Sequence, residues 1–166
     1  WITHQEAHRL IKAATSPESV SGRSLAHQYK SACLADFIEL ALNTGCRKGE
    51  LLSLRWSDVD FSTRLLHLRE TKSGVWQTVP INEEARQVLV RRMRLRDEIC
   101  PDTPWVFFHT TPTRNTSVGD RVKNVRRSFT TACRRAGIED FHIHDLRHTF
   151  ASWLVMNGVP LFEVSK

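Results

Sequence analysis

Residues 44–60 read TGCRKGELLSLRWSDVD, and residues 144–152 read HDLRHTFAS. In the first stretch Arg47 stands between Gly45 and Gly49, at the junction of two expected helices. Glycine lets the backbone come close to a ligand, and a guanidinium group matches two phosphate oxygens at once. The stretch therefore predicts an arginine that is presented rigidly to an anion. An ordinary helix cap followed by a solvated Arg-Lys pair is the alternative interpretation.

The second stretch predicts an anion site at the start of a helix. His144 and Arg147 are three residues apart, so they lie on the same helix face. The helix N-terminus adds free N–H groups and the positive end of the helix dipole. Two alternatives stay open, a His-Arg pair that only caps the helix and a metal site made of His142, His144 and His148. The metal site lacks the glutamate of an HExxH motif and a further Cys pair, and Arg147 would repel a cation.

A third motif is Thr71-Lys72-Ser73-Gly74, between two β-prone runs at Leu65–Arg69 and Val75–Ile81. The runs predict a β-hairpin with Lys72 near its tip. A lysine on such a turn can enter a groove or an active site, although tip lysines are usually only solvated.

Periodicity and capping signals predict the remaining elements. Thr3 and Glu6 have the spacing of a capping box, Gly45 and Gly137 are suited to helix C-termini, and Asn82 is suited to an N-cap. A Ser-, Pro- and Gly-rich loop is expected at residues 16–23. The expected helices cover Thr3–Ala14, Ala32–Leu42, Glu50–Leu54, Glu83–Glu98, Asp120–Arg135 and Asp145–Asn157. The predicted fold class is mainly α with a small antiparallel β-sheet (α+β), in a single domain over residues 1–166.

Composition favours a polyanionic partner. The 166 residues contain 24 Lys and Arg against 18 Asp and Glu, a net charge of +6, although a solvated basic surface would give the same balance. No apolar run has the length of a membrane span and no signal-peptide pattern opens the chain, so a soluble, cytoplasmic protein with no membrane contact is expected. The cysteines form no CxxC pair, and we interpret all four as reduced and structural: Cys33, Cys46, Cys100 and Cys133.

The three motifs, in this order and at these intervals, resemble those of the tyrosine recombinase family, the phage integrases and their Xer-type relatives. Residues 44–60 look like the family's first arginine box, residues 144–152 look like its second, and Lys72 falls on its β-hairpin lysine. The resemblance extends from Thr3 to Val164. It implies the tyrosine recombinase catalytic-domain fold and an activity that breaks and rejoins DNA through a 3′-phosphotyrosine.

The resemblance also implies a role for each site residue. Arg47 and Arg147 would stabilise the charge that develops on the scissile phosphate. Lys72 would be the acid that protonates the departing 5′-oxygen, while His144 would assist proton transfer and hold the phosphate. Glu50 would orient the region around Arg47, with an ordinary salt-bridged residue as its alternative. No metal or nucleotide cofactor is implied, because the covalent intermediate stores the bond energy.

One departure concerns the nucleophile. The family's tyrosine follows its second arginine box, whereas Tyr29, the only tyrosine in these 166 residues, precedes Arg47. We therefore expect a catalytically inactive fragment that lacks the C-terminal tyrosine segment and also the family's N-terminal core-binding domain. The expected partner is double-stranded DNA, with the parent protein a tetramer on DNA and the fragment a monomer. A non-catalytic DNA-binding module from a decayed integrase and a helical metal-dependent hydrolase are the alternative functions.

Overall fold

The computed structural model describes residues 1–15, 25–68 and 77–160, with side chains omitted for residues 25–32. Its elements, in chain order, are α1 (His4–Thr15), α2 (Leu25–Thr44), α3 (Lys48–Leu52), the 3-10 helix η1 (Trp56–Asp58), β1 (Val59–Asp60), β2 (Leu65–Leu68), β3 (Gln77–Pro80), α4 (Glu83–Ile99), α5 (Arg126–Ala136) and α6 (Asp145–Met156). The predicted α+β class is confirmed. None of the described helices is long and apolar enough to cross a membrane.

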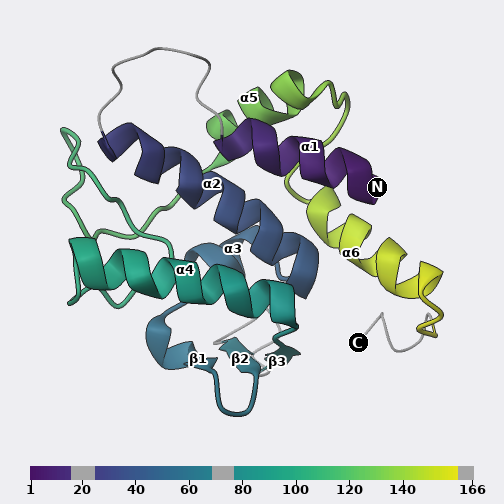
Figure 1. The fold of residues 1–166 in the computed structure, drawn as a ribbon, viewed down its shortest axis with the longest axis horizontal. Coiled ribbons are helices and arrows are strands. Elements are labelled where there is room, and N and C mark those ends of the chain that lie inside the picture. The colour runs from purple at the N-terminus through teal and green to yellow at the C-terminus, as the bar shows by residue number, and fades with distance from the viewer. Residues whose placement is uncertain (16–24, 69–76, 161–166) are drawn as a thin grey trace.

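Helix α2 is the centre of the fold. It contacts α1, α4 and α6, and Figure 1 shows it between α4 on one side and α1 on the other. Phe37, Ile38 and Leu40 of α2 are fully buried. A helix that is apolar on all sides must be covered on all sides, which explains why the most hydrophobic stretch of the sequence forms the central helix.

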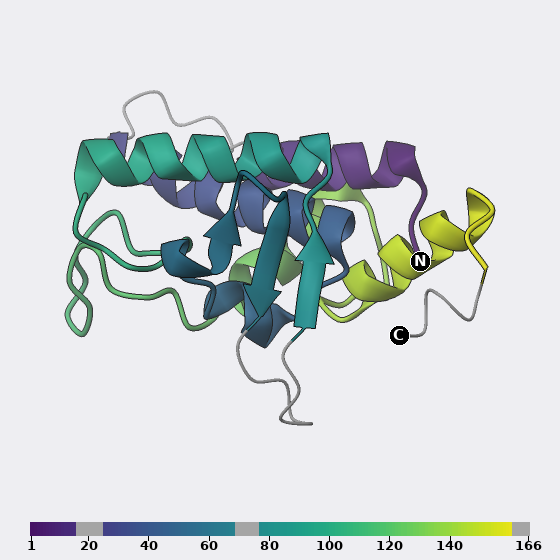
Figure 2. The same cartoon turned by 90° about the horizontal axis from the view of Figure 1, so that it is seen from below.

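A small antiparallel sheet lies at one edge of the molecule, in the strand order β1-β2-β3 (Figures 1 and 2). Leu66 of β2 pairs with Val59 of β1 and with Val79 of β3. Leu66 and Leu68 point into the core, as the alternation of side chains along a strand requires. The two strands of the predicted hairpin are present as β2 and β3. The tip between them, including Lys72, lies outside the described residues.

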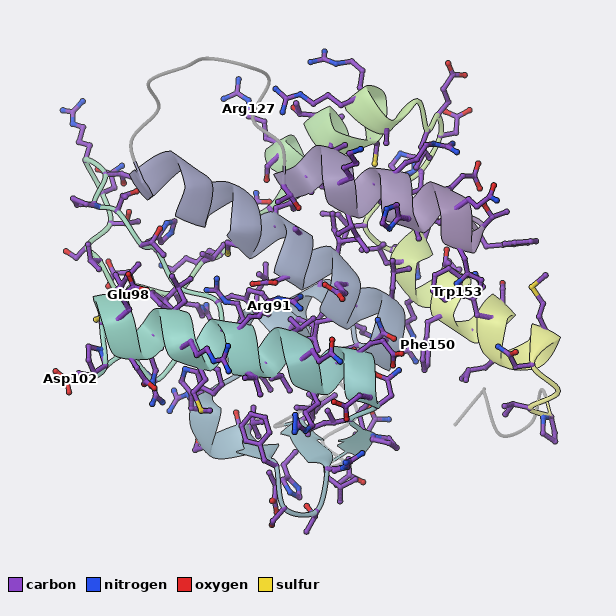
Figure 3. All side chains as sticks on the ribbon, viewed as in Figure 1. Arg91, Glu98, Asp102, Arg127, Phe150 and Trp153 are labelled. Atoms are coloured by element: carbon purple, nitrogen blue, oxygen red, sulfur yellow. The ribbon has the colours of Figure 1, made fainter. Side chains whose placement is uncertain are left out.

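Helix α4 packs on α2 through apolar side chains and through buried charge. Arg91 of α4 lies between the two helices in Figure 3, and its Nη2 atom is 3.1 Å from Oδ1 of Asp36 in α2. The neighbouring Arg92 is fully buried, and its Nε–H donates to the Val106 carbonyl at 3.1 Å. Because an unpaired buried charge is costly, Asp36 fixes where α4 can lie along α2.

Local capping residues act as predicted. The N–H of Glu6 donates to the Thr3 hydroxyl at 3.2 Å, and the Thr3 N–H donates to Oε2 of Glu6 at 2.8 Å, which completes the capping box. The Asn82 side chain accepts from the Ala85 N–H at 2.8 Å at the start of α4. Gly137 ends α5 in the left-handed conformation.

The predicted start of the fifth helix at Asp120 is wrong, because α5 begins only at Arg126. Residues before it run antiparallel to the segment that contains Phe107 and Phe108. Arg121 bridges to Phe108, and the Val122 N–H donates to the Phe107 carbonyl at 3.0 Å. Backbone pairing with a distant segment therefore replaces the first turns of the expected helix.

Candidate active site

Arg47 is held by one carboxylate at two points. It immediately precedes α3, and its N–H donates to Oε2 of Glu50 at 2.7 Å while its Nη1 atom lies 2.8 Å from Oε1 of the same residue. The Glu50 side chain is only 9% exposed, whereas that of Arg47 is 53% exposed. Glu50 thus lies behind Arg47 and leaves much of its guanidinium group open to a ligand. The expected contact is present, and the catalytic roles of both residues stay predictions.

Arg147 lies in the first turn of α6 and reaches back to the turn before Arg47. Its Nη1 atom donates to the Gly45 carbonyl at 2.6 Å, across 102 residues of sequence. This contact brings the two motifs together at the end of α2. Arg47 directly follows Gly45-Cys46 in the chain and Arg147 contacts Gly45, so both arginines lie at this junction.

The backbone of Gly45 makes this approach possible. Its φ angle is +62°, a left-handed conformation that most side chains avoid, and a Cβ atom there would overlap the ring of Phe150. Figure 3 shows Phe150 between α6 and the C-terminal end of α2. Residue 45 must therefore be a glycine for two reasons: the turn needs a left-handed backbone, and the ring of Phe150 leaves no room for a Cβ atom.

Cys46 is buried within this junction. Burial raises the pKa of its thiol to about 11, and the nearby charges of Glu50, Arg147 and Arg47 act on it as well. A thiol with this pKa is protonated at neutral pH. Cys46 is therefore a packing residue of the site, in agreement with its interpretation as a structural cysteine.

His144 is exposed and directly precedes α6, one turn before Arg147. Its ring meets the ring of His148 edge to face, with centroids 4.7 Å apart. The His142 N–H donates to Oδ2 of Asp145 at 2.7 Å, which ties the preceding loop to the first residue of the helix. Within residues 1–15, 25–68 and 77–160, no group of three or more His, Cys, Asp or Glu side chains could hold a metal ion.

The structure thus brings Arg47, Glu50 and Arg147 together, with His144 at the start of the helix that carries Arg147. Lys72 lies outside the described residues. Guanidinium groups presented at one junction, with a helix N-terminus beside one of them, can bind the oxygens of a phosphate and stabilise added negative charge on them. Phe150 and the Gly45 carbonyl also belong to the site, and neither was predicted as part of it. A glycine at residue 45 indicated the turn, whereas nothing in the sequence indicated the contact between residue 45 and Phe150.

Comparisons with known proteins identify the family of the chain. The model of the phage integrase family matches residues 1–166. The integrase of Salmonella phage P22 is 32% identical over 97% of this chain and 38% of its own length. The shufflon-specific DNA recombinase of Escherichia coli is 34% identical over 82% of this chain and 31% of its own length. The chain therefore spans between about a third and two fifths of these two relatives.

Solved structures show the same fold. The XerA recombinase superposes with a TM-score of 0.74 and 25% identity over 99% of this chain and 52% of its own. The catalytic core of lambda integrase superposes with a TM-score of 0.69 and 20% identity, over 95% of this chain and 84% of its own. With the family match over its whole length and the two arginine motifs joined at Gly45, the chain belongs to the phage integrase family, the tyrosine recombinases.

Proposed function

We propose that this chain is the phosphate-binding part of an enzyme that recombines DNA at specific sites by breaking and rejoining strands. The observation that carries the proposal is the contact between Arg147 and the Gly45 carbonyl, which joins the two arginine motifs. Relatives named as an integrase and as a shufflon-specific DNA recombinase support it. Because the chain spans less than half of each, the activity of the whole protein is part of the proposal.

In the proposed mechanism Arg47 and Arg147 bind the scissile phosphate from two directions. Attack by a hydroxyl increases the negative charge on the non-bridging oxygens, so the two guanidinium groups bind the transition state more tightly than the ground state. Glu50 keeps the Arg47 side chain oriented. His144 holds a phosphate oxygen and assists proton transfer, and Lys72 protonates the departing 5′-oxygen.

The nucleophile in this proposal is a tyrosine outside these 166 residues, and it forms a 3′-phosphotyrosine. Tyr29, the only tyrosine present, belongs to α2 and precedes Arg47 in the chain. A nucleophile must approach the phosphorus in line with the departing oxygen. Residues that follow α6 are closer in the chain to Arg147 and His144, which favours a tyrosine beyond the second arginine motif.

The proposed partner is duplex DNA, and the proposed assembly of the parent protein is a tetramer on that DNA. Among the structural neighbours, a lambda integrase tetramer is bound to a Holliday junction, and the XerH recombinase is bound to its difH substrate. The net charge of +6 agrees with a polyanionic partner. We propose that the 166-residue chain by itself is a monomer.

Trapping of a covalent DNA adduct tests the mechanism. The 166-residue chain and a longer protein that continues through the next tyrosine are incubated with nicked duplexes that carry the candidate attachment site, and denaturing electrophoresis then detects protein joined to DNA. We expect an adduct only with the longer protein, and none when Arg147 of that protein is changed to Ala.

The controls separate the alternatives. An adduct of the 166-residue chain that disappears in the Tyr29→Phe variant would assign the nucleophile to Tyr29 and overturn the proposed mechanism. A longer protein that binds the duplex with full affinity but never forms an adduct would instead support the non-catalytic DNA-binding module.

A further inference from the structure

The start of the chain is attached to the helix that carries Arg147. Ile2 is buried, and its N–H donates to Oγ1 of Thr149 at 3.2 Å. Its carbonyl accepts from Nε1 of Trp153 at 3.1 Å. The ring of His4 stacks on the ring of Trp153, with centroids 3.9 Å apart and planes 25° from parallel. Residues 2–4, which we call the N-terminal strap, thus use both backbone groups of Ile2 to hold α6.

Besides its contact with the end of α2, helix α6 buries few side chains. Only Leu146 and Thr149 of its twelve residues are buried, and Val155 and Met156 near its end are exposed. Apolar packing is non-directional, so a helix with few buried side chains can slide or rotate at small cost. Directional hydrogen bonds from a neighbouring segment remove that freedom. Figure 2 shows α6 extending away from the rest of the molecule toward its C-terminal end.

The strap and the active site hold different faces of the same helix. Thr149 and Trp153 are four residues apart and form one face, which meets the strap. Arg147 and Phe150 meet the Gly45 turn at the end of α2. A shift of α6 after loss of the strap contacts would therefore move the Arg147 guanidinium group relative to Gly45 and Arg47.

We propose that Thr149 and Trp153 are positioning residues, through which the N-terminal strap sets the place of Arg147 in the phosphate site. The inference rests on the proposed function, because the place of Arg147 affects activity only if Arg147 binds a phosphate. Whether the N-terminal strap sets the place of Arg147 can be tested without that function. An ordinary packing role would cost stability alone and would leave the geometry of the folded site unchanged.

The test is a pair of substitutions in the 166-residue chain. Thr149→Ser keeps the hydroxyl that accepts from Ile2, and Thr149→Val keeps the shape but removes the acceptor. NMR spectra report the Cys46 backbone amide, which directly follows the Gly45 carbonyl, and the Nε–H of Arg147. We expect both signals to shift in Thr149→Val and in Trp153→Phe, which loses the indole donor but keeps a ring for His4. Thr149→Ser should retain the parent spectrum.

Two controls separate positioning from stability. Val88→Ala removes buried volume from α4, which packs on α2, and lowers the melting temperature. Met156→Ala changes an exposed side chain of α6 itself. Both should leave the Cys46 and Arg147 signals in place. Unchanged signals in Thr149→Val and Trp153→Phe, at a loss of melting temperature equal to that of Val88→Ala, would overturn the inference.

Titration with inorganic phosphate adds a functional readout. We expect Thr149→Val to weaken phosphate binding at least three-fold relative to Thr149→Ser. If the parent chain itself bound no phosphate, the proposed function would fail, while the two NMR signals would still decide the positioning role. A displaced Arg147 signal together with parent-like phosphate affinity would show that the strap does not act on the phosphate site.

Discussion

The properties of Arg47 depend on a single carboxylate. Glu50 accepts from both the N–H and the guanidinium group of Arg47, so the same side chain fixes the start of α3 and the direction of the arginine. A hydrogen bond between charged groups is stronger and more directional than one between neutral groups. The orientation of Arg47 should therefore be more sensitive to the charge of residue 50 than to its shape.

We predict that Glu50→Gln weakens duplex DNA binding about three- to ten-fold, because an amide oxygen is a weaker acceptor than a carboxylate. Fluorescence anisotropy with a labelled duplex measures the change. Glu84→Gln, which removes the same charge from an exposed position of α4, is the matched control and should leave the affinity within a factor of two. Equal effects of the two substitutions would mean that only net charge matters.

Cys46 should react slowly with thiol reagents, because it is buried and its pKa is raised to about 11. We predict that iodoacetamide at pH 8 modifies the partly exposed Cys100 first, with Cys46 protected until the chain unfolds. Peptide mass spectrometry over time measures each rate. Early modification of Cys46 in the folded chain would contradict the burial of the junction.

The Cys46 thiol should also make the stability of the fold depend on pH. Its pKa in the folded chain lies above the ordinary value of 9.0, so the folded state keeps the proton more tightly than the unfolded chain does. The stability contribution of protonated Cys46 is complete below about pH 9 and is lost as the pH rises toward about 11. A Cys46→Ala variant should show a smaller loss of stability across this range.

At the scale of elements, the sequence predicts what depends on local chemistry. The capping box at Thr3, the cap at Asn82 and the apolar length of α2 needed no knowledge of distant residues. The start of α5 was mispredicted because Val122, Val125 and Phe129 recur at helical spacing although Val122 pairs with Phe107 in an extended segment. Periodicity reports burial, and both an extended and a helical segment can bury these side chains.

In the candidate site, too, the residue types could be predicted from the sequence and the contacts between distant segments could not. Arg47, His144 and Arg147 could be selected because their types suit a phosphate ligand, and Glu50 could be selected from the order of the motifs as a partner of Arg47. The Gly45 carbonyl and the Phe150 ring could not be selected, because their contacts arise only when α6 packs against the end of α2. Sequence spacing along one helix gives no information on which helix it will meet.

The junction of α2 and α6 leads to a prediction about Gly45. Gly45→Ala introduces a methyl group into the space of Phe150 and a side chain at a φ angle of +62°. We expect a loss of about 2–4 kcal/mol in the free energy of unfolding, from strain and overpacking together. Urea denaturation measures this loss. Gly49→Ala, at a glycine whose Cβ would meet nothing within 4 Å, is the control and should cost much less.

A smaller side chain at residue 150 separates the effect of overpacking from the effect of backbone strain. Phe150→Leu combined with Gly45→Ala should restore the part of the stability that overpacking removes, but not the part due to the backbone conformation. Full recovery in the double variant would show that the left-handed turn carries no strain for alanine.

At the scale of the whole molecule, the charge distribution predicts how the chain meets DNA. The excess of six positive charges should produce weak binding with a steep dependence on salt, because phosphate contacts release bound counterions. We predict a slope of log K against log salt of about −3 to −6, equivalent to roughly three to seven phosphate contacts. Anisotropy titrations at several salt concentrations measure it, and a slope near zero would contradict the prediction.

Matched substitutions locate the contacts. Arg47→Gln should reduce the magnitude of the slope by about one unit, as expected for the loss of one phosphate contact. Lys12→Gln removes the same charge from α1, which Figure 2 shows on the opposite side of the molecule from α3. It should leave the slope unchanged.

The bond from Trp153 to Ile2 joins residues that are 151 positions apart, and it has a consequence for the order of folding. Contacts of such long sequence separation close late, since most of the chain must first be ordered. Among the described residues, the segments that α6 contacts, α2 and residues 2–4, precede it in the chain and leave the ribosome first. A nascent chain therefore has its core helices before it has a complete phosphate site, and we expect it to acquire affinity for DNA only at the end of folding.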